Sequence, residues 1–399
     1  MTILGQWGRG TGTQRWFSVE SAPALHIRPS AMKLAPMASL ACLAVAVGLW
    51  PASARADVVE WLYDVDVAVG TTASGEVDPR RAAGSALREL LVRMTGLKPL
   101  PNTAAVRGAI ANPDRYYAQY GFVTRPAARV PEDDPAADAT ETRLAVRFDT
   151  SAVLDLLRSA ELPIWGQDRP RVLIWLVLDR EHRRREVASA GSGDIPAKLH
   201  EAARQRGLLV ELPLLDLPDQ ALAPADLWGG FGARVDAASR RYDPDVLVVA
   251  RLHEGREGAW TVDWRLRDPG DRASEARDLS YAADETESLR WAIDRTADEL
   301  GRRLAVTGTS TDVMQLVVTG ADTPPAYGAV LRYLASREYL EQVDVVGWAG
   351  TSLELALHAR TDASRVRGLL SLGGMFAIGD SGVPSAGQPS AHMVWRGAR

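Results

Sequence analysis

The chain has 399 residues, of which 46% are hydrophobic and 24% charged, enough apolar material for several folded domains. Its formal net charge is −5 at pH 7. An acidic chain without a basic stripe is poorly suited to bind nucleic acid or an anionic membrane surface, so we expect neither as a partner.

Residues 32–56 have the layout of a secretory signal peptide. Lys33 gives a positive flank, residues 38–50 form a short apolar run, and Ala54-Arg55-Ala56 matches an A-x-A cleavage pattern. The run is shorter than the about 20 apolar residues of a membrane span. We therefore predict a periplasmic protein, cleaved after Ala56, with no stable membrane span in its mature chain.

Residues 1–31 fit nothing in this scheme, and a mis-assigned start codon explains them better than a functional extension. Cys42 is the only cysteine and lies inside the apolar run. Its acylation is disfavoured because Ser39 stands where a lipid-attachment box has leucine. Cleavage after Ala56 leaves a cysteine-free chain, which excludes disulfides, a thiol nucleophile and a Cys-ligated metal.

Residues 57–166 are predicted to form an α+β domain. Residues 58–69 alternate and are rich in β-branched and aromatic residues, which predicts a strand. Pro79 then opens a helix with apolar residues at helical spacing, and Gly96 is placed to cap its end. The other expected elements are helices at 103–111 and 151–160 and paired strands at 121–125 and 143–148.

Residues 169–306 are predicted to form an α/β domain around a mostly parallel sheet with an antiparallel extension. The continuous apolar run at 172–178 is typical of a strand buried on both faces, and a buried strand is also predicted at 246–252. Residues 259–267 alternate, which indicates an antiparallel strand with one exposed face. The other expected elements are helices at 195–206, 234–241 and 289–304 and a strand at 208–212.

Residues 312–379 are predicted to form a ferredoxin-like β-α-β-β-α-β domain. Thr323 and Pro324 start its first helix, and Asp362 starts its second. The fold class is therefore α/β and α+β, with several small mixed domains. The last residues, 380–399, are rich in Gly, Ser and Pro and are predicted to be a disordered tail.

The sequence predicts no catalytic residue, cofactor or metal site. Its histidines lack zinc-site spacing, and it contains no HExxH, G-x-S-x-G, Walker or GxGxxG motif. Tryptophan beside glycine can form a partner or ligand site, which makes Trp165, Trp228, Gly229 and Gly230 the candidate contact residues. For Trp165 a plug in the seam between two domains is favoured, and for Trp228 both interpretations stay open.

Six segments together resemble the uncharacterised family DUF2066 of exported proteobacterial proteins. They are LLVRMTG (90–96), YYAQYGF (116–122), LPIWGQDRPRVLIWLVLD (162–179), LPLLDL (212–217), DLWGGF (226–231) and ASRRYDPDVLVVARL (238–252). The resemblance spans residues 57–306 and implies a bacterial envelope protein. It implies no activity and no functional residues.

Three functional hypotheses follow. The leading one is a non-catalytic binding or scaffold protein of the cell envelope, which contacts an envelope protein through a domain seam or an edge strand of the ferredoxin-like domain. The second is a cell-wall or glycan hydrolase in which two of Asp216, Asp219 and Asp226 act as an acid and base pair. The third is a small-ligand-binding protein with Trp228 stacked on the ligand.

Overall fold

The structure is a computed structural model that describes residues 60–69, 78–126, 140–180, 185–230, 232–308, 311–349, 351–379 and 390–397. All of them belong to one compact unit, Ser53–Arg399. The predicted signal peptide at 32–56 and the segment 1–31 before it lie outside the described residues.

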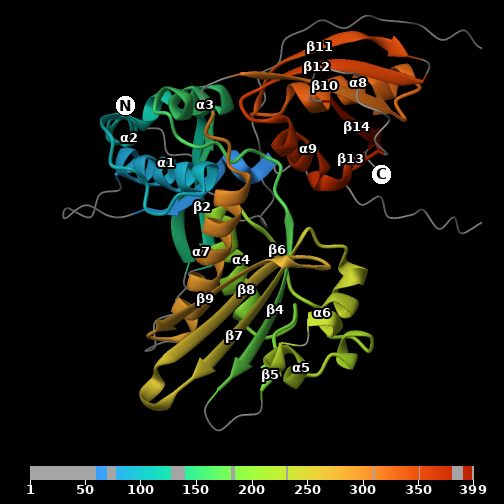
Figure 1. Cartoon of the computed structure of the whole chain (residues 1–399). Coiled ribbons are helices and arrows are strands. Elements are labelled where there is room, and N and C mark those ends of the chain that lie inside the picture. The colour runs from blue at the N-terminus through green and yellow to red at the C-terminus, as the bar shows by residue number, and fades with distance from the viewer. Residues whose placement is uncertain are drawn as a thin grey trace, which may run out of the picture. The chain divides into compact units, whose positions relative to one another are not determined.

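The first sheet has three antiparallel strands in the order β1-β3-β2 (Figure 1). Its elements are β1 (Asp64–Ala68), α1 (Pro79–Thr95), α2 (Ala104–Ala111), β2 (Tyr117–Pro126), β3 (Thr140–Phe148) and α3 (Thr150–Ser159). The predicted apolar stripe of α1 is buried, and Gly96 ends the helix at φ 71°, a backbone conformation that glycine adopts without strain.

The second sheet is mixed, in the order β5-β4-β7-β8-β9, with β6 also paired to β4. Its strands are β4 (Arg171–Asp179), β5 (Glu186–Val187), β6 (Leu209–Glu211), β7 (Val246–Glu254), β8 (Trp260–Asp268) and β9 (Asp271–Ala282). Because β4 is parallel to β6 and β7 while β8 and β9 are antiparallel, the predicted parallel centre with an antiparallel extension is confirmed.

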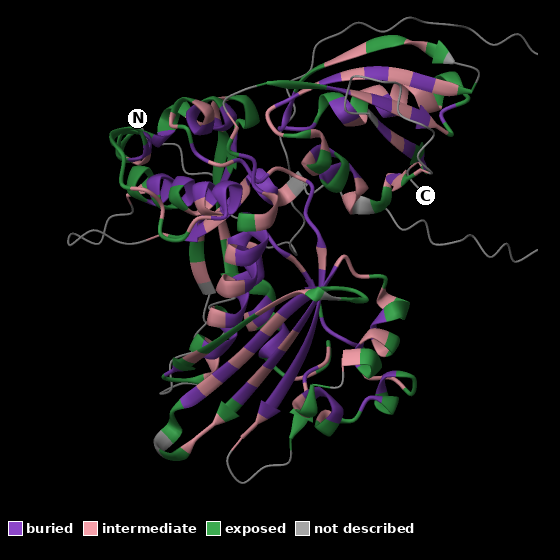
Figure 2. Cartoon of the chain, in the orientation of Figure 1, coloured by how far each residue is buried: buried purple, intermediate pink, exposed green. Residues whose placement is uncertain are grey.

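Helices cover both faces of the second sheet, which explains why the β4 sequence is apolar throughout. They are α4 (Ile195–Arg206), α5 (Pro224–Gly229), α6 (Gly232–Ser239) and α7 (Glu285–Leu304). Alternate β4 residues such as Ile174 and Leu176 pack with α4 and α7, and the others, such as Trp175, pack with α5 and α6. Figure 2 shows β4 buried along its length.

The third sheet contains the predicted β-α-β-β-α-β order. Its elements are β10 (Asp312–Thr319), α8 (Pro324–Ala335), β11 (Leu340–Ala349), β12 (Ser352–Ala359), α9 (Ala363–Ser371), β13 (Phe376–Ile378) and β14 (Ser390–Trp395). The strand order is β11-β12-β10-β14-β13. Thr323 and Asp362 cap α8 and α9 by accepting backbone N–H bonds, as predicted.

The prediction of a disordered tail over 380–399 is wrong for residues 390–395. These residues form β14, which pairs in parallel with β10 and antiparallel with β13. Ala391, Met393 and Trp395 alternate along it and are buried. The prediction rested on the Gly, Ser and Pro content of the whole segment, which does not reveal a short alternating strand. The two neighbouring strands supply the hydrogen bonds of β14.

Among the described residues, no helix combines the length and apolar character that crossing a membrane requires. The longest helix, α7, carries acidic residues in its first turn and arginines in its last.

Candidate functional site

The structure separates the predicted contact residues into two places. Trp165 has 1% of its surface exposed, and its indole lies 3.8 Å from the guanidinium carbon of Arg169. The Trp165 backbone N–H donates to the Met94 carbonyl at the end of α1. A side chain so enclosed has no surface to offer a partner.

Buried charges continue from Trp165 toward the third sheet. The carboxylate of Asp168 accepts from Arg337, and the side chains of both residues are less than 10% exposed. Glu338 Oε1 accepts the backbone N–H of Gln167 at 3.1 Å. A Cβ at Gly166 would lie 2.2 Å from Glu338 Oε2, so a larger residue here would require this carboxylate to move.

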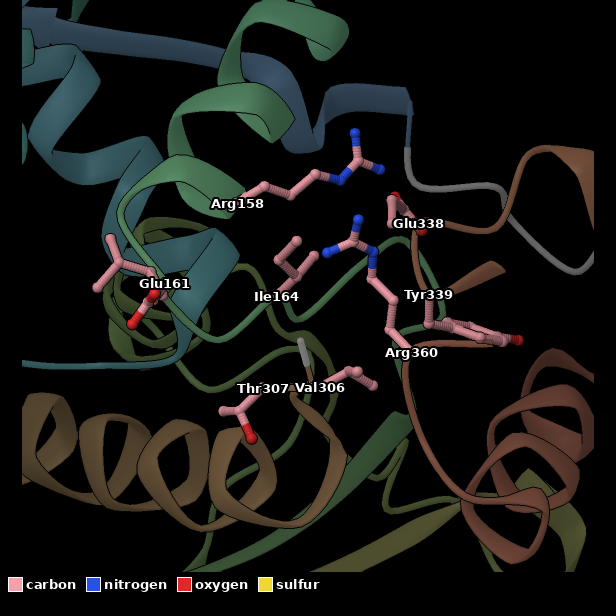
Figure 3. Close-up of a pocket in the computed structure, with 10 residues that line it drawn as sticks. Arg158, Glu161, Ile164, Val306, Thr307, Glu338, Tyr339 and Arg360 are labelled. Carbon is pink, nitrogen blue, oxygen red and sulfur yellow. The ribbon is translucent and has the colours of Figure 1, made fainter. Parts of the chain in front are cut away.

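A small pocket lies beside these charges. Figure 3 shows the guanidinium groups of Arg158 and Arg360 and the carboxyl group of Glu338 directed into it. Its volume is about 20 Å³, and a cavity of this size holds about one water molecule. The pocket is therefore too small for an organic ligand.

Burial raises the pKa of Glu338, and the nearby Asp168 carboxylate raises it further. The folded state therefore binds this proton more tightly than the unfolded chain. We expect the free energy of unfolding to fall as pH rises from about 4.3, the usual glutamate pKa, through the raised folded-state pKa. Glu338→Gln should remove this part of the pH dependence of the free energy of unfolding, as measured by chemical denaturation between about pH 4 and pH 8. The same pH dependence in the variant and in the unaltered chain would contradict the prediction.

Trp228 lies on the short helix α5. Pro224 starts α5, and the Asp226 side chain reaches back to accept the Ala223 backbone N–H at 3.1 Å. Gly230 ends the helix at φ 76°, again in the left-handed region. The helix buries Leu227 completely and leaves the following Trp228 half-buried.

Three polar side chains surround Trp228, and with it they form what we call the Trp228 cluster: Trp228, Arg185, Asp179 and His253. The Arg185 guanidinium carbon lies 4.1 Å from the indole centre, and the His253 ring lies edge-on at 6.3 Å. Asp179 Oδ2 contacts Arg185 Nε at 3.0 Å and His253 Nδ1 at 3.2 Å. One carboxylate therefore contacts both side chains that lie against the indole.

The cluster lies where binding sites are common in α/β folds. Asp179 and His253 are register partners at the carboxyl ends of the parallel strands β4 and β7, and open α/β sheets usually bind ligands beyond this edge. Sequence reasoning named neither residue as a contact residue, although each follows a segment predicted as a buried strand. Gly229 and Gly230 are exposed beside the cluster.

The aspartates of the hydrolase hypothesis are engaged in local structure. Asp216 accepts from Arg241 at 2.7 Å, and this hydrogen bond holds the pKa of Asp216 below its ordinary value. Asp219 is fully buried and accepts from the Leu215 N–H and the Tyr242 hydroxyl. The lowered pKa makes Asp216 poorly suited to be the general acid of a glycosidase.

The part of the chain that the structure describes contains no group of three or more His, Cys, Asp or Glu side chains placed to hold a metal ion.

The family DUF8605, described as a domain of unknown function, matches residues 56–166. This match corrects the resemblance to DUF2066, because the matched family is a different one and ends before the second sheet begins. The six short segments behind that resemblance were specific only in combination, so they did not fix the family. No curated protein sequence matches the chain.

Three solved structures share limited similarity with the chain. The C-terminal domain of LpoB from Salmonella enterica is 12% identical, with a TM-score of 0.19, over 28% of this chain and 82% of that one. PelC from Paraburkholderia phytofirmans, a dodecamer, is 13% identical, with a TM-score of 0.20, over 34% of this chain and 89% of that one. Lipoprotein GNA1162 from Neisseria meningitidis is 10% identical, with a TM-score of 0.21, over 33% of this chain and 95% of that one. Likenesses at this level carry no argument about function.

Proposed function

We propose that the chain is an exported, non-catalytic binding or scaffold protein of the bacterial cell envelope, and that it holds a partner protein at the Trp228 cluster. The predicted signal peptide at 32–56 supports the location. The observation that carries the binding role is the half-buried Trp228 indole between Arg185 and His253 at the carboxyl edge of the sheet.

The chemistry of the cluster suits a protein partner. Tryptophan and arginine are the residue types enriched among the few that dominate binding energy at protein interfaces. Trp228 itself packs partly against the apolar cluster that contains Leu227, so its side chain loses less freedom on binding than a fully exposed one would. Asp179 holds Arg185 in place, so the arginine is also ordered before a partner arrives.

The same geometry argues against a stacked small ligand. Arg185 already covers one face of the indole at 4.1 Å. A sugar or aromatic ligand on that face would have to displace Arg185 and leave Asp179 with a single partner.

The test is site-specific crosslinking in a bacterial host. A photo-crosslinking amino acid replaces Trp228 in a chain expressed from Met32, and the crosslinked proteins are identified by mass spectrometry. We expect one dominant envelope protein. The matched control carries the crosslinker at Trp348, an exposed tryptophan on the edge strand β11. A product at position 348 alone would move the interface to β11, and no product at either position would overturn the proposal.

Affinity for the captured partner gives a second measurement. Trp228→Ala should weaken binding by about thirtyfold, the effect of losing a hot-spot residue of about 2 kcal/mol. Trp348→Ala should leave the affinity unchanged within about twofold, because surface substitutions outside an interface have small effects. Equal effects of the two substitutions would contradict docking at Trp228.

A further inference from the structure

We infer that a second site, on the sheet side of the Gly230 turn, binds an oxyanion, either a carboxylate or a phosphate group. The site, called the arginine pocket here, is lined by Gly230, Arg251 on β7, and Arg265 and Arg267 on β8. Its volume is about 30 Å³, which suits one or two oxygen atoms of such a group and not the whole group. The inference is independent of the partner proposed for Trp228.

Arg251 supplies the first observation. Its side chain is 10% exposed, its Nε donates to the Leu227 carbonyl at 3.1 Å, and its Nη1 donates to Asp263 at 3.0 Å. Its Nη2 is buried and has no hydrogen-bond partner. Leaving a buried donor unpaired costs about 1–3 kcal/mol, and more when the group is charged. An acceptor bound in the pocket would remove this cost.

Gly230 supplies the second observation. A Cβ at this position would lie 3.1 Å from Arg265 Nη1 and 3.3 Å from Arg251 Nη2. The two guanidinium groups therefore converge on one point just outside the Gly230 backbone. Glycine leaves this point open, and its φ of 76° adds a second reason for glycine there.

The charges around the pocket favour an anion. Asp263 is shared between Arg251 and Arg265, Asp236 pairs with Arg267 at 2.6 Å, and Glu275 pairs with Arg277. The pocket lining carries three of these arginines, Arg251, Arg265 and Arg267, and one carboxylate, Glu275. Burial lowers the pKa of Arg251, and the neighbouring Arg265 cation lowers it further. A bound oxyanion would supply an acceptor for Nη2 and a negative charge beside the Arg251 and Arg265 guanidinium groups.

The inference is tested by thermal unfolding of the full chain with inorganic phosphate, acetate or chloride at matched ionic strength. We expect phosphate or acetate to raise the midpoint temperature of unfolding in a saturable way. The rise should be about 3 °C when the anion concentration is about ten times the dissociation constant. A shift with phosphate alone assigns a phosphate group, and a shift with acetate alone assigns a carboxylate. A shift with neither, or an equal shift with chloride, would overturn the inference.

Variants separate a built site from an adventitious ion. Arg251→Gln and Arg265→Gln should abolish the shift, and the exposed Arg256→Gln should retain it. Gly230→Ala is matched by Gly258→Ala, because both glycines have φ near 76° but a Cβ at Gly258 meets nothing within 4 Å. Only Gly230→Ala should lose anion binding. Equal shifts in all variants would mean an adventitious ion only and would refute the site.

Discussion

Replacing Arg337 with methionine will destabilise the chain by about 3–5 kcal/mol, the effect of removing one partner from a buried ion pair. Asp168 would keep its buried charge with no cation to compensate it, since the side chain of Arg337 is 3% exposed and that of Asp168 is 8% exposed. Arg337 also donates to the Tyr333 carbonyl at 3.1 Å and lies over the Tyr333 ring. Chemical denaturation at neutral pH measures the loss.

The control is Arg332→Met on α8, the helix that precedes Arg337 in the chain. Arg332 is exposed, so its replacement should change the free energy of unfolding by no more than about 0.5 kcal/mol. Adding Asp168→Asn to Arg337→Met should restore part of the loss, because it removes the uncompensated charge. A loss below about 1 kcal/mol in Arg337→Met would show that the pair is not buried as the structure has it.

Removing residues 390–399 will prevent the third sheet from folding, although the rest of the chain keeps its own cores. β14 pairs on both sides, so its loss breaks two ladders and leaves β13 without a described neighbour. A single change, Trp395→Ala, should destabilise the third sheet by about 3–5 kcal/mol. Trp395 is 7% exposed, and its ring centre lies 5.0 Å from that of Phe376.

Hydrogen exchange resolves these effects by segment. In the truncated chain, β10 and β12 should lose amide protection while β4 and β7 retain it. The matched control is Val394→Ala, because Val394 neighbours Trp395 but is 37% exposed on the opposite side of the strand. Its effect should stay below about 1 kcal/mol. Full protection of β10 in the truncated chain would restore the interpretation of a disordered tail.

Local patterns predicted the elements that carry strong periodicity. About ten neighbouring residues are enough to predict the apolar stripe of α1, the caps at Thr323 and Asp362, and the buried run of β4. β14 could not be predicted in this way. Its six residues form a strand because β10 and β13 lie on either side, and this information is distant in the sequence.

The site was predictable only in part. The glycine pair after Trp228 drew attention to the correct turn, but its helix α5 is too short to show periodicity. Asp179 and His253 meet through the register of β4 and β7, which a single sequence does not reveal. Arg265 and Arg267 share a face of β8 by alternation, yet nothing local places Arg251 and Gly230 against them.

The interior position of β14 also makes the third sheet depend on a late segment of the chain. Until Ser390–Trp395 has docked, β10 has only β12 beside it among the described strands and presents its other edge unpaired. Unpaired apolar edges are templates for pairing between chains. The third domain is therefore vulnerable to aggregation until this strand docks, and a chaperone that covers the free edge of β10 would protect it.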